Sequence, residues 1–127
     1  MRFIVIEGLD GSGKSTQIRL VEEFFRKRNI KCKFIHFPRP EAPVYGELIN
    51  RFLRGELGEI DKVNPYLIAL IYAGDRNDAA KLLNEWMNSG YLVIADRYLY
   101  SNIAFQCAKL SKGRQRDDMA KWIKNLE

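Results

Sequence analysis

Residues 8–16 read GLDGSGKST, and this stretch decides the fold. A short apolar run, residues 3–6, comes before it, and an amphipathic segment from 14 to about 28 comes after it. Glycines let the backbone curl so that successive N–H groups point inward at an anion, and the start of a helix adds its positive end. The stretch therefore predicts a buried strand, a phosphate-binding loop and a helix, in that order.

The spacing of the loop fits the pattern G-x-x-x-x-G-K-[ST], in which each residue type has a task. Lys14 supplies a point charge for the β- and γ-phosphates of a nucleoside triphosphate, and the Ser15 hydroxyl ligates Mg²⁺. A glycine-rich turn that matches by chance is the alternative, and the order strand, loop, helix argues against it. The residues expected to bind ATP are Gly8, Gly11, Ser12, Gly13, Lys14, Ser15 and Thr16.

A second acidic anchor is expected at Asp96, directly after the apolar run 91–95. Ligands of α/β sheets bind at the carboxyl ends of the strands. We therefore expect Asp96 at a strand tip, as a ligand of the metal or of its waters. A solvated loop aspartate is the alternative interpretation.

Composition narrows the functional classes. The chain has 127 residues, which suits one domain, and a formal net charge of +5. A nucleic-acid-binding function is disfavoured because the basic residues are spread out and the densest cluster, 109–116, is followed by two aspartates. Two distant cysteines and one histidine disfavour a zinc site. The longest apolar stretch, 66–73, is too short to span a membrane, so a cytoplasmic protein with reduced thiols is expected.

The pattern along the chain predicts an α/β fold of three layers, a P-loop NTPase fold with a parallel sheet and helices on both faces. Strands are expected at 3–6, 31–37 and 91–95. Helices are expected at 14–28, at 43–53, at 65–74 as a helix buried on all sides, at 79–87 as a separate amphipathic helix, at 101–110 and at 117–126.

Four segments in one order, GLDGSGKSTQ (8–17), FPRP (37–40), YAGDR (72–76) and ADRYLYSNIAFQ (95–106), resemble the thymidylate kinase family. The resemblance runs from residue 3 to about residue 109. It implies a phosphotransferase, a nucleoside monophosphate kinase that converts dTMP to dTDP for dTTP biosynthesis. It also implies ATP and Mg²⁺ as cofactors, a homodimer, and no nucleic-acid or membrane partner.

The resemblance assigns roles near the transferred phosphate. Lys14, Asp10 and Arg97 are implied to be catalytic. Asp10 approaches the 3′-hydroxyl of the nucleotide sugar or organises the transfer centre, and Arg97 pairs with the acceptor phosphate. Phe37 and Arg39 border the acceptor site, with Arg39 near that phosphate. From the residues alone, Arg97 could instead neutralise the neighbouring Asp96.

The resemblance also assigns the residues that recognise the base and the sugar. Tyr72 stacks on thymine and Arg76, four residues on, hydrogen-bonds its carbonyl edge. Phe105, where a tyrosine is common, crowds a ribose 2′-hydroxyl. Ser101, Asn102 and Gln106 offer polar contacts to the base or sugar.

Each of these residues has an ordinary structural alternative. Tyr72 and Phe105 could be core residues, and Arg76 could form a surface ion pair with Asp75. The functional interpretation is favoured because three arginines, Arg39, Arg76 and Arg97, are expected at or just beyond element boundaries. Their planar guanidinium groups can each donate two hydrogen bonds, which is what a dianionic acceptor requires.

The sequence departs from the family in two ways. Gly11 stands where some members carry an arginine, so a catalytic arginine is expected from a later lid, beyond Arg114 and Arg116. Three strands are expected where the family has five, which leaves 3–6 as an open apolar edge.

We therefore expect 1–127 to be a single P-loop kinase domain, its N-terminal portion, without the lid and last two strands. A half of a split kinase, a truncated relative that binds nucleotide without transferring phosphate, and a stand-alone miniature stay open. So do a deoxynucleoside kinase, another monophosphate kinase, and uracil in place of thymine.

Overall fold

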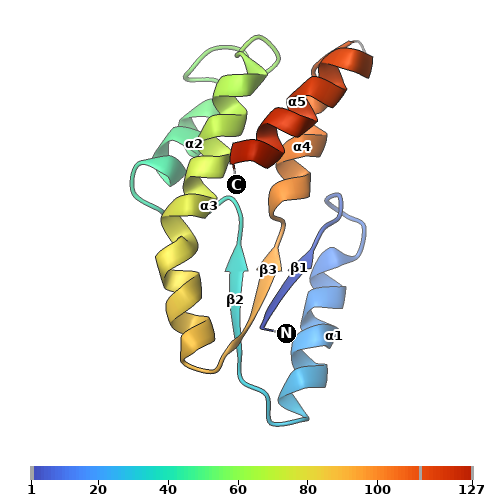
Figure 1. Ribbon diagram of the computed structural model, residues 1–127, viewed down its shortest axis with the longest axis vertical. Helices are drawn as coiled ribbons and strands as arrows, with labels where there is room; N and C mark the ends of the chain where they lie inside the picture. The colour runs from blue at the N-terminus through green and yellow to red at the C-terminus, as the bar shows by residue number, and fades with distance from the viewer. Residues whose placement is uncertain (1, 112, 127) are drawn as a thin grey trace. The chain divides into compact units, whose positions relative to one another are not determined.

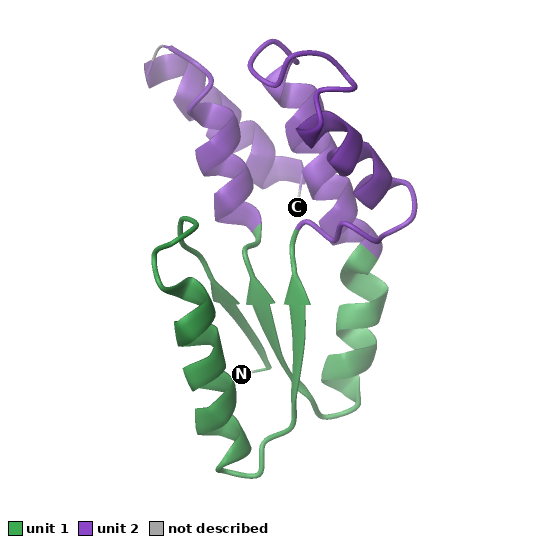
Figure 2. Ribbon diagram, turned by 180° about the vertical axis from the view of Figure 1, so that it is seen from behind, with its two compact units in different colours: residues 1–37, 79–98 green, residues 38–78, 99–127 purple. Residues whose placement is uncertain are grey.

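The computed structural model describes residues 2–111 and 113–126 and contains three strands and five helices in that part of the chain (Figure 1). Their order is β1 (Phe3–Ile6), α1 (Lys14–Arg26), β2 (Cys32–His36), α2 (Tyr45–Leu53), α3 (Pro65–Asn88), β3 (Leu92–Asp96), α4 (Leu99–Cys107) and α5 (Gly113–Leu126). The chain forms two compact units (Figure 2). Unit 1 consists of Met1–Phe37 and Ala79–Tyr98, and unit 2 of Pro38–Asp78 and Leu99–Glu127.

Unit 1 is built on a parallel sheet of strand order β1-β3-β2. All five residues of the central strand β3 are buried. One face of the sheet packs on the second half of α3 through Ile35, Val93, Ala95, Ala79 and Leu83. Helix α1 lies on the other face (Figures 1 and 2). The predicted α/β fold with a parallel sheet and helices on both faces is therefore confirmed.

Strand β1 is an edge strand among the described residues, as the sequence predicted. It pairs only with β3, with Ile4 opposite Ile94 and Ile6 opposite Asp96. Its four residues are half-buried, whereas the residues of β3 are buried. An apolar strand with one unpaired edge is open to a further strand.

Unit 2 is helical and contains α2, the first half of α3, α4 and α5. Its core includes Ala69 of α3, Cys107 of α4, and Met119 and Ile123 of α5. The Trp122 ring on α5 meets Tyr66 of α3 edge-on, with ring centroids 4.8 Å apart. The apolar face predicted for the last helix is therefore covered by α3 and α4.

The expectation of two helices between residues 65 and 87 was wrong. The structure has one continuous helix, α3, of 24 residues. It starts where predicted, because the Asn64 Oδ1 accepts a hydrogen bond from the Tyr66 N–H at 3.0 Å and caps the first turn. The first half is also not buried on all sides, since Leu67 and Leu70 are 58% and 50% exposed.

Helices α2, α4 and α5 begin at residues other than those predicted. α2 begins two residues after Pro43, because Val44 has φ 65° and ψ −72° and the Tyr45 N–H bonds the Pro43 carbonyl at 2.8 Å. This is a γ-turn, which a β-branched residue rarely adopts. α4 begins at Leu99 and α5 at Gly113, each earlier than expected.

Candidate nucleotide-binding site

The loop between β1 and α1 has the backbone that its glycines predicted. Gly11 and Gly13 have φ angles of 76° and 90°, in the region that L side chains rarely adopt. The Ser12 N–H and Oγ both donate to the Leu9 carbonyl, at 3.2 and 2.6 Å, which closes the turn. Helix α1 starts at Lys14, and its N-cap residue Gly13 has no side chain that could cap the first N–H groups. An uncapped helix start behind a glycine turn suits an anion.

Lys14 is held at the carboxyl end of the central strand. Its Nζ lies 2.7 Å from the Asp96 Oδ1, and the two side chains are only 8% and 11% exposed. Asp96 is the last residue of β3, which confirms it as a strand-tip acid. The His36 Nε2, at the end of β2, lies 3.8 Å from the other carboxylate oxygen. Lys14 therefore points toward the sheet and not into solvent.

Arg97 turns toward the loop, where its Nη2 donates to the Asp10 Oδ1 at 2.5 Å. Its φ of 65° directs the chain just after β3. Asp96 pairs with Lys14, and Arg97 pairs with Asp10. Asp10 itself is 93% exposed. The ion pair thus joins the loop, through Asp10, to the residue that follows β3.

Phe37, which the resemblance placed beside the acceptor site, is a core residue of unit 1. It is 3% exposed, and its ring meets Tyr98 edge-on at 5.5 Å. Tyr98 meets Phe3 in the same manner, and its N–H donates to a Glu7 carboxylate oxygen at 2.9 Å. These contacts fix the chain beside Arg97.

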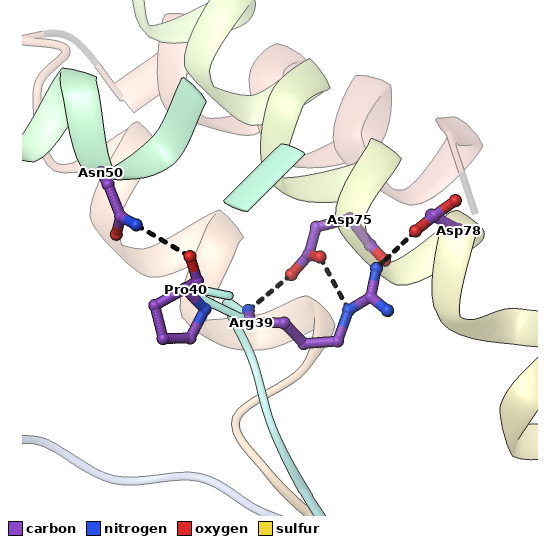
Figure 3. Close-up of polar contacts among 5 residues, drawn as sticks. All are labelled: Arg39, Pro40, Asn50, Asp75 and Asp78. Carbon is purple, nitrogen blue, oxygen red and sulfur yellow. Dashed lines mark hydrogen bonds and ion pairs between the residues drawn. The ribbon is translucent and has the colours of Figure 1, made fainter. Parts of the chain in front are cut away.

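In unit 2, Arg39 is engaged by two acids on α3 (Figure 3). Its Nε donates to the Asp75 Oδ1 at 2.9 Å, and its Nη2 donates to the Asp78 Oδ2 at 2.7 Å and to the Asp75 carbonyl at 3.1 Å. Burial lowers the pKa of the Arg39 guanidinium, but the hydrogen bonds to Asp78 and Asp75 outweigh it and raise the pKa above its ordinary value. Arg39 is therefore a permanent cation, as arginine is in proteins generally.

Tyr72 and Arg76 lie one helical turn apart on α3, as predicted. Arg76 is 2% exposed and Asp75 is 1% exposed, so the alternative of a surface ion pair between them is wrong. Arg76 also lies in the middle of α3, so the prediction that it stands at an element boundary was wrong. Charged side chains are rarely buried unless they are paired, so two adjacent buried ones make this turn of α3 a candidate for a functional role.

Helix α4 carries the remaining predicted contacts. Asn102 and Gln106, four residues apart, are each 3% exposed. The Asn102 Nδ2 donates to the Ala69 carbonyl of α3 at 3.1 Å, but neither the Asn102 Oδ1 nor the Gln106 Oε1 has a hydrogen-bond partner among the described residues. Phe105 is 46% exposed, so it is not a core residue, and Ser101 is half-buried. Two buried acceptors without donors are costly unless a ligand or water satisfies them.

Asp75 is the residue of this region whose importance the sequence interpretation missed. A signal was present, because Ile68, Tyr72, Asp75 and Ala79 follow helical spacing and form one stripe. An acid in a stripe of otherwise apolar and aromatic residues is expected to be buried and paired.

The residues present fit Mg²⁺ and the phosphates of ATP. The uncapped start of α1 and Lys14 would hold the phosphates, while the Ser15 hydroxyl and the Asp96 carboxylate would ligate the metal. Within residues 2–111 and 113–126, no group of three or more His, Cys, Asp or Glu side chains forms a metal site by itself.

A parallel α/β sheet, a glycine loop that leads into a helix and a lysine held at a strand tip define a P-loop NTPase fold. No helix in the described part of the chain has both the length and the apolar character needed to cross a membrane.

The family model described as thymidylate kinase matches residues 6–117, and the chain belongs to the thymidylate kinase family. A probable thymidylate kinase of Thermococcus onnurineus is 41% identical over 112 residues, which cover 84% of this chain and 54% of the relative. The thymidylate kinase of Plasmodium falciparum is 33% identical over 110 residues, with 87% and 50% covered.

Among solved structures, the thymidylate kinase of Candida albicans superposes with a TM-score of 0.79 at 30% identity, over 98% of this chain and 56% of that one. The chain thus spans about half the length of the curated relatives that it matches.

Proposed function

We propose that this chain carries out, or forms part of an enzyme that carries out, the ATP-dependent phosphorylation of dTMP to dTDP in dTTP biosynthesis. The observation that carries the proposal is the Lys14–Asp96 pair behind the glycine loop, in a chain of the thymidylate kinase family. The proposal includes a cytoplasmic location, where both nucleotides are made and used.

On the donor side, unit 1 would bind ATP. Main-chain N–H groups of the loop and the start of α1 surround the phosphates, and Lys14 exchanges part of its contact with Asp96 for the β- and γ-phosphates. Mg²⁺, when bound, neutralises charge on the β- and γ-oxygens. Ser15 and Asp96 are its proposed ligands, and Arg97 and Asp10 are proposed at the transfer centre.

On the acceptor side, unit 2 would recognise the base. The Asn102 Oδ1 and the Gln106 Oε1 are buried acceptors that need a donor, and a keto pyrimidine such as thymine offers one N–H between two carbonyls. Arg76 would donate to a base carbonyl and Tyr72 would stack on the ring. Ser101 and Phe105 are proposed to contact the sugar, and Arg39 the phosphate.

We also propose a homodimer that forms through α3. Leu67 and Leu70 lie three residues apart on one face of the helix, and each residue is at least half exposed. Ile71, next to them, is half-buried. Apolar side chains grouped on an exposed helix face are typical of an interface.

The proposal is tested by dTMP-dependent release of ADP from ATP and Mg²⁺ by the 127-residue chain. We expect turnover that is lost in Lys14→Ala and in Arg97→Ala, because each removes a charge that stabilises the transferred phosphoryl group. Lys62→Ala is the control, since the Lys62 side chain is 76% exposed and forms an ion pair with Glu59 on the surface. Wild-type chain that binds dTMP and ATP but releases no ADP would contradict transfer by this chain alone.

A second candidate function is nucleotide binding without transfer, as a portion of a kinase that needs further residues. It is supported by the match to about half of the relatives' length. Calorimetric binding of ATP and dTMP without turnover would favour it. A uracil nucleotide as acceptor is a variant of the first candidate, because uracil has the same N–H and carbonyl groups.

A further inference from the structure

A buried carboxylate on α3 holds both the backbone and the side chain of Arg39. The Asp75 Oδ2 accepts from the Arg39 backbone N–H at 2.9 Å, and the Oδ1 accepts from the Nε, also at 2.9 Å (Figure 3). Asp75 is 1% exposed. Two charge-assisted hydrogen bonds to one residue fix its main-chain position and its side-chain direction together.

The contacts of Arg39 leave one edge of its guanidinium available. The Nε and the Nη2 donate to Asp75 and Asp78, whereas the Nη1 makes no hydrogen bond or ion pair with the described residues. In Figure 3 the Nη1 is the terminal nitrogen without a dashed line. Its two N–H groups are the part of this cation that a further anion would meet.

The segment that carries Arg39 is also fastened by close packing within unit 2. A Cβ on Gly46 would lie 2.4 Å from the Arg39 carbonyl oxygen, so α2 approaches the segment as closely as only glycine permits. The Asn50 Nδ2 donates to the Pro40 carbonyl at 2.8 Å (Figure 3). The Tyr45 ring lies on Gly74 of α3, one residue before Asp75. The acid and the segment that it holds thus form one rigid arrangement.

We propose that Asp75 is a positioning residue for the acceptor phosphate: it orients Arg39 so that the Nη1 edge meets a phosphate dianion. This inference rests on the proposed function, and it deepens it by assigning Asp75 a role. Asp75 touches no nucleotide in this account and acts through Arg39. It also neutralises a cation that is 18% exposed and would otherwise be poorly solvated.

The test compares dTMP with thymidine, which lacks the phosphate, by calorimetric titration of the 127-residue chain. In Asp75→Asn one carbonyl oxygen must serve both Arg39 donors, and an amide NH₂ now faces the guanidinium. We expect dTMP binding to weaken about tenfold or more and thymidine binding to change less than about twofold. If Asp75 had only a structural role, its substitution would weaken the binding of dTMP and of thymidine by the same factor.

The matched control is Asp78→Asn. Asp78 also contacts Arg39, but its side chain is 49% exposed and accepts one bond only. We expect less than about a threefold change in dTMP binding, as for an exposed ion pair. The melting temperature of each variant reports whether it folds.

A second variant keeps the test decisive if Asp75→Asn does not fold. Arg39→Lys leaves a cation beside Asp75 but has no planar fork, so dTMP binding should fall about tenfold while thymidine binding is kept. Equal loss for both ligands, or no loss for dTMP, in the variants that fold would overturn the inference. If the wild-type chain binds no dTMP, the proposed function fails and the inference fails with it. If the wild type binds dTMP but the variants do not discriminate dTMP from thymidine, only the inference fails.

Discussion

At the scale of the residue, two buried acids organise the candidate site. Asp96 holds Lys14 in unit 1, and Asp75 holds Arg39 in unit 2. In each pair the acid lies in a strand or a helix. The cation lies outside it, Lys14 at the start of α1 and Arg39 in the segment after β2. Removing one partner of a buried pair leaves the other charge uncompensated, so both acids matter for stability as well as for ligands.

Residue types and spacing were sufficient to predict both members of the first pair as site residues, although not their ion pair, and did not single out Asp75 of the second. Lys14 follows from the loop pattern and Asp96 from the apolar run before it. Asp75 could not be assigned, because its partner is 36 residues away and only the tertiary structure brings the two together. The exposure of Phe105 and the burial of Phe37 were likewise decided by packing.

The close approach of Tyr45 to Gly74 on α3 leads to a prediction about the stability of the protein. An added Cβ would lie 2.2 Å from the Tyr45 ring, so the ring would have to move away from α3. Gly74→Ala should therefore destabilise the protein by about 1–3 kcal/mol in chemical denaturation, despite alanine's better helix propensity.

The control for this prediction is Gly113→Ala, at the first residue of α5, where an added Cβ meets nothing within 4 Å. Its free energy of unfolding should stay within about 0.5 kcal/mol of the wild type or rise slightly. Equal effects of the two substitutions would contradict the packing of Tyr45 on Gly74.

At the scale of the element, the strands were predictable and the longest helix was not. All three strands were predicted to within one residue at either end, the first and third from apolar runs and the second from residues 31–37, which a proline follows. The polar residues after Gly74 indicated a break in a helix, yet α3 continues, because Asp75 and Arg76 are buried there instead of exposed. Tertiary pairing thus overrode the local pattern.

The exposed face of α3 gives a prediction on assembly. If Leu67 and Leu70 lie in a homodimer interface, Leu70→Glu buries a charge there and should convert the dimer to a monomer in sedimentation analysis. Leu20→Glu is the matched control, because Leu20 on α1 has a similar exposure of 46%, and it should leave the sedimentation coefficient unchanged. A wild-type chain that sediments as a monomer would rule out the proposed dimer.

At the scale of the whole molecule, the sequence was sufficient to predict the class and the family. The motifs lie in the order and on the elements that were expected: the loop between β1 and α1, the YAGDR segment on α3, and Asp96 at the end of β3. The division into two compact units was not predicted, because each unit combines segments that lie far apart in the sequence, residues 1–37 with 79–98 and residues 38–78 with 99–127.

The central claim is that the glycine loop and Lys14 bind the phosphates of ATP. Calorimetric titration of ATP with Mg²⁺ tests it most directly, on the wild type, on Lys14→Ala and on Lys27→Ala, a control on α1 whose lysine is 70% exposed. We predict that wild type and Lys27→Ala bind ATP equally and that Lys14→Ala binds at least about tenfold more weakly. Wild-type chain that binds no ATP, or a Lys14→Ala variant that binds as tightly as wild type, would contradict the claim.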